Sequence, residues 1–184
     1  AEVRLIPADR LVKLPEALSF EQGAAMMLQG MTAQYLLRRT YRVQPGDTIL
    51  IHAAAGGVGL IVCQWAKALG AKVIGTVGSD EKAALAKAHG CDHPIVYTRE
   101  KFADRVKDLG LLAKMGALFI TRPTLFVYTA KRSDLVQTAD ELFGMVTSGK
   151  VKIEVNQRYA LKDAAKAQSD LEARKTTGST ILLP

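Results

Sequence analysis

The chain has 184 residues, and its composition of 48% hydrophobic and 23% charged residues is that of a globular protein with a sizeable core. No apolar run approaches the roughly 20 residues of a membrane span, and no charged-then-apolar leader opens the sequence, so we expect a cytoplasmic protein. The net charge is +7, but the basic residues are spread out and form no block of the kind that binds nucleic acid. A nucleic-acid partner is therefore not expected.

The first predicted elements are a short strand, Val3–Ile6, and a proline-flanked extended stretch that follows it. We interpret residues 1–18 as the end of a preceding domain. Ser19, with Gln22 three residues later and an apolar run after it, predicts the capped start of a helix. Helical spacing then continues over Met31–Tyr41.

The most informative stretch is TILIHAAAGGVGLIVCQWAK, which covers Thr48–Lys67. Thr48–Ala53 predicts a strand buried on both faces, and helical spacing resumes over Leu60–Leu69. The small residues between them let backbone N–H groups approach a ligand at the positive end of a helix dipole, which favours a pyrophosphate. The dinucleotide fingerprint G-x-G-x-x-G falls on Ala54, Gly56 and Gly59, so alanine replaces its first glycine. We predict contact with a dinucleotide at Ala54, Ala55, Gly56, Gly57, Val58, Gly59 and Leu60; the alternative is an ordinary turn that binds nothing.

The next strand, Ala71–Val77, indicates which dinucleotide would bind. NAD enzymes tend to place Asp or Glu at the end of this strand, where it binds the ribose 2′-hydroxyl. Gly78 and Ser79 stand there instead, and Lys82 offers a cation one helical turn on, a pattern that favours NADPH. Against this, Asp80 and Glu81 lie between them, Ser79 is a common type of helix N-cap, and Lys82 can be a solvated charge.

The rest of the chain continues the alternation of strands and helices. Helices are predicted over Ser79–His89, Lys101–Leu109, Ser133–Thr147 and Leu161–Ala173, and strands over Pro94–Tyr97, Val151–Val155 and Thr180–Leu183. This order predicts an α/β protein with a Rossmann-type, doubly wound parallel sheet. The three histidines show no metal-ligand spacing with one another or with the two cysteines, so no metal is expected.

A longer pattern around the glycine turn is more specific. Gly46-Asp47, Leu50, Ala54-Ala55-Gly56-Gly57, Gly59, Gln64 and Lys67 together match the signature of the zinc-free quinone oxidoreductase (zeta-crystallin) branch of the medium-chain dehydrogenase/reductase family. PADRLVKLP, GMTAQYLL, ALGAKVIGTVGS, LFITRPTL and LEARKTTGSTILLP are similar to family segments in family order. The resemblance implies hydride transfer from NADPH to a quinone or another small electrophilic acceptor.

The resemblance also implies roles for single residues, although no catalytic residue is assigned. It places Thr32 and the strand residues Phe119, Ile120 and Thr121 near the nicotinamide, Tyr97 on the adenine side, and Arg174 on the 2′-phosphate together with the serine and lysine above. For two of these residues an alternative role without a ligand stays open. Thr32 can be a helix hydroxyl bonded to the backbone, and Arg174 can be a cation at a helix end.

The chain departs from the family pattern between Asp108 and Leu111. By resemblance Ala117–Thr121 is the sixth strand of the sheet, and it pairs with a second subunit to form a homodimer. The sequence segments expected for strands 4 and 5 of the family pattern are missing. We predict a dinucleotide-binding domain over residues 19–174 with an internal deletion near 109/110, a strand over 175–184 returning toward the catalytic domain, and no GroES-like N-terminal barrel. Besides quinone reduction, a zinc-free enoyl reductase or a non-enzymatic nucleotide-binding or dimerising module, one touching RNA included, stays open.

Overall fold

The computed structural model describes residues 4–109 and 124–184. Its helices are α1 (Phe20–Tyr35), α2 (Gly57–Ala68), α3 (Asp80–Ala88), α4 (Phe102–Asp108), α6 (Leu125–Tyr128), α7 (Arg132–Thr147) and α8 (Ala164–Glu172). Its strands are β1 (Thr48–Ile51), β2 (Lys72–Val77), β3 (His93–Val96), β4 (Val155–Ala160) and β5 (Ser179–Leu183). Short 3-10 turns cover Ala8–Arg10 and Leu161–Asp163, and a π-helical turn over Leu36–Thr40 ends α1.

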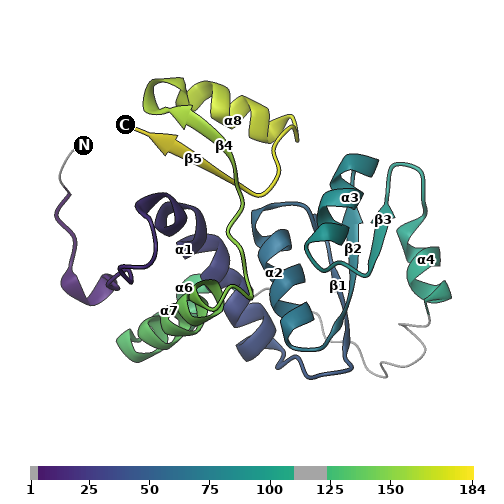
Figure 1. Cartoon of the computed structure of the whole chain (residues 1–184), viewed down its shortest axis with the longest axis horizontal. Coiled ribbons are helices and arrows are strands. Elements are labelled where there is room, and N and C mark those ends of the chain that lie inside the picture. Colours follow the sequence, from purple (N-terminus) through teal and green to yellow (C-terminus); the bar gives the residue numbers. More distant parts are fainter. Residues whose placement is uncertain (1–3, 110–123) are drawn as a thin grey trace.

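Two parallel sheets organise these elements (Figure 1). β1, β2 and β3 lie side by side in that order, with Thr48 opposite Lys72 and Ile74 opposite His93. β4 and β5 form a second, two-stranded parallel sheet that α8 accompanies. The alternating βαβ order of the first sheet confirms the predicted α/β, Rossmann-type class.

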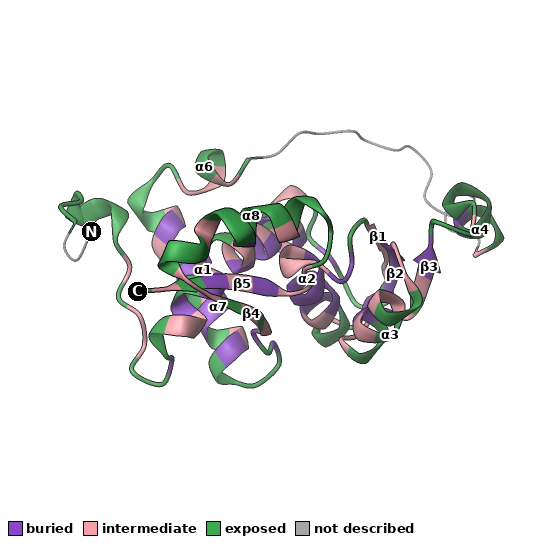
Figure 2. Ribbon diagram, turned by 90° about the horizontal axis from the view of Figure 1, so that it is seen from above, coloured by how far each residue is buried: buried purple, intermediate pink, exposed green. Residues whose placement is uncertain are grey.

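The first sheet has a different core on each face, and Figure 2 marks buried residues along α1, α2 and α7, which contribute to the larger core. Val73 belongs to the large core that also contains Met26 of α1, Trp65 of α2 and Leu142 of α7. Its neighbour Ile74 belongs to a small cluster with residues of β3 and α4. Because successive side chains of a strand point to opposite faces, the main core and the α4 cluster lie on opposite sides of β2.

The predicted capping of α1 is confirmed. The Ser19 hydroxyl accepts the Gln22 N–H at 3.1 Å, and the Gln22 side-chain oxygen accepts the Ser19 N–H at 2.9 Å. These two bonds satisfy backbone donors that the first turn of a helix leaves free. At the amino end, residues 4–6 form no strand, so the strand expected over Val3–Ile6 is wrong over those residues, and Val3 lies outside the described residues.

The strand predicted over Val151–Val155 is wrong. Val151 and Ile153 are buried as their alternation with charged residues predicts, but the strand begins only at Val155. The Lys152 backbone bonds instead to one side chain, because Gln64 Oε1 accepts its N–H at 2.8 Å and Gln64 Nε2 donates to its carbonyl at 3.0 Å. A side-chain amide thus occupies the place of a neighbouring strand. The strand expected over Ala117–Thr121 lies outside the described residues.

The C-terminal segment returns to the glycine turn. The Gly178 N–H donates to the Ala55 carbonyl at 3.1 Å, and Gly56 and Gly178 form an isolated parallel bridge. This contact places the start of β5 directly beside the turn that follows β1.

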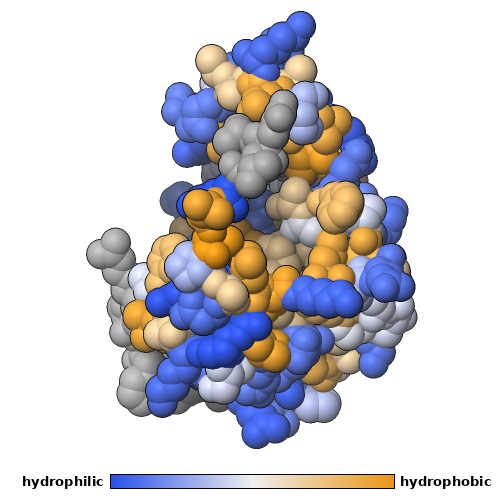
Figure 3. Space-filling model, turned by 90° about the vertical axis from the view of Figure 1, so that its left-hand side faces the viewer, coloured by the Kyte–Doolittle hydropathy of each residue, from blue (hydrophilic) through white to orange (hydrophobic). Residues whose placement is uncertain are grey.

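Large apolar side chains are exposed on the described surface, among them Phe20, which is 90% exposed, and Leu28, which is 65% exposed. Figure 3, which faces the left-hand end of the molecule in Figure 1, shows apolar patches between hydrophilic ones. No helix of the described residues is long and apolar enough to cross a membrane.

Candidate functional site

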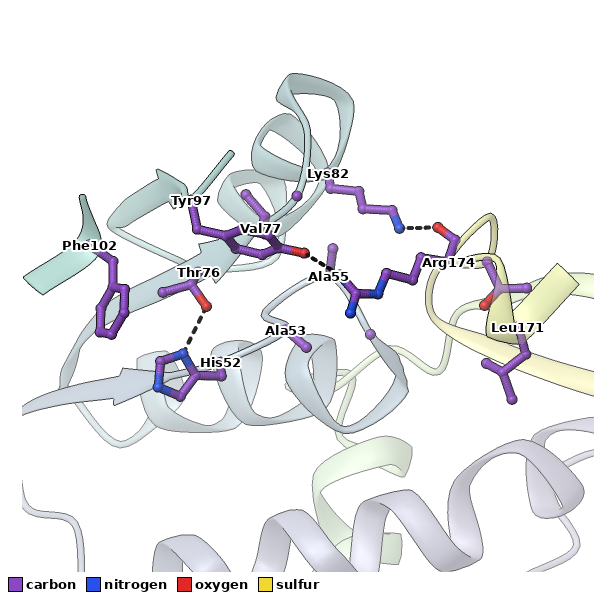
Figure 4. Close-up of a pocket in the computed structure, with 13 residues that line it drawn as sticks. His52, Ala53, Ala55, Thr76, Val77, Lys82, Tyr97, Phe102, Leu171 and Arg174 are labelled. Atoms are coloured by element: carbon purple, nitrogen blue, oxygen red, sulfur yellow. Dashed lines mark hydrogen bonds between the residues drawn. The ribbon is translucent and has the colours of Figure 1, made fainter. Parts of the chain in front are cut away.

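A cleft of about 670 Å³ opens at the carboxyl ends of β1, β2 and β3 (Figure 4). This edge of a doubly wound sheet is where such folds bind ligands. The cleft is lined by His52, Ala53, Ala55, Gly56, Thr76, Val77, Gly78, Lys82, Tyr97, Phe102, Leu171, Arg174 and Thr176. Residues from the strand ends and from the α8–β5 connection therefore share one cavity.

The glycine turn forms the floor of this cleft. Ala53 adopts a left-handed backbone with φ of 54°, and Gly56 is the N-cap of α2 without any side-chain cap. A Cβ on Gly59 would lie 2.7 Å from the carbonyl carbon and oxygen of Ala54, so only glycine lets α2 begin this close to the strand. The uncapped N–H groups of the first helical turn and the helix dipole favour an anion there.

Two cations meet at the rim of the cleft. The Lys82 ammonium donates to the Arg174 carbonyl at 2.5 Å, and the Arg174 guanidinium donates to the Tyr97 hydroxyl at 3.4 Å (Figure 4). Arg174 also has a left-handed backbone, with φ of 57°. Residues after β2 and β3 and at the end of α8 thus meet across the mouth of the cleft.

The two carboxylates near this rim do not line the cleft. Asp80 forms an ion pair with Arg99 at 2.5 Å. A hydrogen bond from the Ser79 hydroxyl lowers the pKa of Glu81, with a smaller effect of a backbone N–H, which keeps this exposed group ionised. Neither carboxylate is among the lining residues. Their negative charges, which count against a 2′-phosphate in the sequence analysis, therefore lie outside the wall of the cleft.

The structure brings six of the residues predicted from the sequence to the wall of the cleft: Ala55, Gly56, Gly78, Lys82, Tyr97 and Arg174. Ala54, Gly57, Val58, Gly59 and Leu60 belong to the turn and α2 beneath it but do not line the cavity. Phe119, Ile120 and Thr121 lie outside the described residues.

Two predicted residues have local bonding roles. Ser79 is the N-cap of α3, and its hydroxyl accepts the Lys82 N–H at 3.3 Å. The Thr32 hydroxyl donates to the Leu28 carbonyl at 2.7 Å within α1, and Thr32 does not line the cleft. Both bonds are the local ones that the alternatives without a ligand describe: an N-cap for Ser79 and a backbone-bonded helix hydroxyl for Thr32. Direct contact of either residue with a ligand therefore stays a prediction.

Seven lining residues were not among those predicted from the sequence: His52, Ala53, Thr76, Val77, Phe102, Leu171 and Thr176. His52 Nδ1 lies 3.0 Å from the hydroxyl of the buried Thr76, and the His52 ring meets Phe102 edge-on, with centroids 5.5 Å apart. The position of His52 and Thr76 near the ends of β1 and β2 was the available signal, because side chains there face the ligand edge. No local signal marks Phe102, since its place depends on how α4 packs.

The residues present fit an NADPH molecule. Gly59 lets α2 begin close to the strand, the first turn of α2 offers N–H donors, and the rim carries two cations and no carboxylate among its described lining. These features match the diphosphate and the 2′-phosphate respectively. No group of three His, Cys, Asp or Glu residues that could hold a metal occurs within residues 4–109 and 124–184.

Fold and cleft define a Rossmann-type dinucleotide-binding protein. A family model described as zinc-binding dehydrogenase matches residues 57–147. The quinone oxidoreductase of Pseudomonas aeruginosa is 44% identical over 230 residues, covering 100% of this chain and 71% of that protein. Quinone oxidoreductase 1 of Escherichia coli is 40% identical and is covered to the same extent. The chain belongs to the quinone oxidoreductase branch of the medium-chain dehydrogenase/reductase family.

Solved structures agree with this assignment. A Pseudomonas syringae quinone oxidoreductase matches with a TM-score of 0.90 and 47% identity over 97% of this chain and 69% of that one. An Escherichia coli quinone oxidoreductase complexed with NADPH matches with a TM-score of 0.89 and 40% identity over 96% and 69% of the two chains.

Proposed function

We propose that this chain binds NADPH in the cleft and serves an NADPH-dependent quinone oxidoreductase. One observation carries the proposal. Lys82 and Arg174 are in contact at the rim of the cleft, while the neighbouring carboxylates are not among the residues described as lining it. A 2′-phosphate gains from both cations and would be repelled by a carboxylate. The solved quinone oxidoreductase complexed with NADPH supports this choice of cofactor.

Each part of the cleft has a separate task in this function. The first turn of α2 holds the diphosphate by backbone N–H groups, and Gly59 keeps the helix close to β1. Lys82 and Arg174 hold the 2′-phosphate, with Tyr97 orienting the guanidinium. NADPH supplies the hydride, so these residues bind and orient, and no nucleophilic side chain is needed.

Titration of the chain with NADPH and with NADH tests the cofactor assignment. The two differ only by the 2′-phosphate, so quenching of the Trp65 fluorescence should report tighter binding of NADPH by at least about tenfold. Equal affinities would contradict a role for the cationic rim. No binding of either dinucleotide would contradict the proposed function altogether.

A quinone is the acceptor that the relatives' names support. The name of another relative supports a second candidate acceptor. The 2-haloacrylate reductase of a Burkholderia species is 36% identical and is covered over 70% of its length. Its name says that it reduces a 2-haloacrylate, and reduction of that carbon–carbon double bond is the type of reaction expected of the enoyl reductase alternative. Loss of absorbance at the NADPH band in the full-length protein with a quinone, compared with a haloacrylate, separates the two.

For the 184-residue chain by itself we propose nucleotide binding without turnover, because it spans only 71% of the length of the Pseudomonas aeruginosa relative. The exposed Phe20 and Leu28 support packing of a further domain on α1. In the whole protein we propose a cytoplasmic homodimer through Ala117–Thr121. Tight binding of NADPH by an intact full-length protein that shows no turnover would instead favour a nucleotide-binding or dimerising module.

A further inference from the structure

The cleft has a cationic end and an aromatic end (Figure 4). Lys82 and Arg174 lie at one end, Phe102 and His52 lie at the other, and the Tyr97 ring lies between them. All five side chains belong to the lining of the same cavity. The 2′-phosphate accounts for the cationic end alone, so the aromatic end is left for another part of the ligand.

The aromatic end continues one face of the first sheet. Leu50 and Ile74 belong to the small cluster that also includes a residue of α4. Side chains two residues further along a strand point to the same face, which places His52 and Thr76 above this cluster at the carboxyl edge of the sheet. Since α4 packs on this face and begins at Phe102, it brings the Phe102 ring to the same edge.

The rings of His52 and Phe102 form a corner. Their centroids lie 5.5 Å apart, and their planes are at 89° to one another. His52 Nδ1 lies 3.0 Å from the hydroxyl of the buried Thr76, and this bond holds the imidazole in place. Phe102 is large and apolar, yet it is 41% exposed and lines the cleft. The corner therefore offers an open aromatic surface on which a flat ring can stack.

Covalent connectivity decides which ring of NADPH reaches this corner. Adenine and the 2′-phosphate are carried by the same ribose, whereas the diphosphate and a second ribose separate them from the nicotinamide. With the 2′-phosphate between Lys82 and Arg174, the ring that shares this part of the cavity is the adenine. Stacking on aromatic side chains is a general way in which proteins hold bases.

We propose that Phe102 and His52 form the seat of the adenine base, and that Phe102 is a further cofactor-binding residue on which the base stacks. The inference rests on the proposed function, because it needs an adenine dinucleotide in this cleft. NADPH and NADH carry the same base, so the contact strengthens the binding of both. Lys82, in contrast, contacts the 2′-phosphate and serves NADPH alone.

Calorimetric titration of the chain with NADPH, NADH and adenosine 2′-monophosphate tests the stacking. Phe102→Ala should weaken the binding of all three about tenfold, because each carries adenine, and Phe102→Tyr, which keeps the ring, should stay within about twofold of the unsubstituted chain. The control is Phe126→Ala, at a phenylalanine of α6 that is 83% exposed and does not line the cleft, and it should change no affinity.

Three results of this titration would overturn the inference: unchanged affinities in Phe102→Ala, an equal loss in Phe102→Tyr, or a loss for the two dinucleotides without one for the monophosphate. The last result would place the nicotinamide, and not the adenine, at Phe102. Failure of the unsubstituted chain to bind either dinucleotide would refute the proposed function as well, so the two failures differ.

A second measurement uses the unsubstituted chain. It has three histidines, and the proton magnetic resonance signal of His52 is the one that His52→Gln lacks. At a fixed pH, saturation with adenosine 2′-monophosphate should shift this signal, because the ring current of the base acts on the protons nearest to it, and should leave those of His89 and His93 unchanged. Inorganic phosphate, which has no ring, should not shift it. An equal shift with phosphate, or none with the monophosphate, would overturn the inference even if Phe102→Ala folds poorly.

Discussion

One substitution, glycine to alanine, is expected to have opposite effects at two helical positions. At Gly59, in the first turn of α2, the new Cβ would lie 2.7 Å from the carbonyl carbon and oxygen of Ala54, whereas ordinary contacts begin at 3.4 Å. The nearest atoms are backbone, so α2 itself must move away from β1. Such overpacking costs about 1–3 kcal/mol. At Gly144, inside α7, a Cβ would meet nothing within 4 Å. There alanine gains up to about 1 kcal/mol, because glycine loses more backbone entropy in a helix.

For a chain of this size, 1 kcal/mol corresponds to roughly 2–4 °C in the melting temperature. Gly144→Ala should therefore raise the melting temperature by up to about 2–4 °C, and Gly59→Ala should lower it by about 2–12 °C. Calorimetric melting with and without NADPH measures both effects, and only Gly59→Ala should also weaken the cofactor-induced shift. Shifts in the same direction for the two variants, or a Gly59→Ala variant with unchanged stability and binding, would refute the close helix–strand contact.

Three further substitutions test other parts of the structure. Lys82→Ala should weaken NADPH binding about 10–100-fold and leave NADH binding unchanged, because it removes a charged contact to the 2′-phosphate; equal losses in a fluorescence titration would contradict this. Burial opposes ionisation of Asp92, but hydrogen bonds from the Lys67 ammonium at 2.5 Å and the Val73 N–H at 2.8 Å lower its pKa below the usual 3.8. A lowered carboxyl pKa stabilises the fold above the unfolded-state value and loses that effect as the pH falls through the folded-state value. Asp92→Asn should thus cost about 1–2 kcal/mol at pH 7 and progressively less below about pH 3.8 in urea unfolding; a pH-independent cost would be contrary evidence. Ser19→Ala breaks the capping box and should lower the free energy of unfolding by about 1 kcal/mol. An unchanged thermal unfolding curve would show that the cap does not stabilise the fold.

Features that depend on local sequence were predictable. The capping box at Ser19, the helix after the glycine turn and the absence of a carboxylate on the cleft wall after β2 all follow from neighbouring residues. In each case the signal and the structure lie within a few residues of one another. Pattern reasoning therefore predicted residues of the floor of the candidate site and Lys82 at its rim, whereas Arg174 was expected only from the resemblance to the family.

Features that depend on distant partners were not predictable. The alternation of Val151–Val155 is that of a strand, but the Gln64 amide, far away in sequence, takes the backbone bonds of Lys152. Phe102 reaches the cleft only because α4 packs beside β3 and brings its ring into T-shaped contact with the ring of His52. No spacing within the sequence encodes these contacts.

Burial of β1 shows the same limit and bears on the predicted internal deletion. β1 and β2 are both apolar and rich in β-branched residues, yet β2 is buried at five of six positions and β1 only half-buried at all four. β2 pairs with a strand at each edge, whereas β1 pairs at one edge within residues 4–109 and 124–184, so the number of neighbours sets the burial. The aligned segment of the Pseudomonas aeruginosa relative is 230 residues long against 184 here, a difference of 46. This exceeds the roughly 30 residues of a βαβ unit and supports our prediction of an internal deletion near 109/110. A further strand beside β1 would then give it the burial on both faces that its sequence predicts.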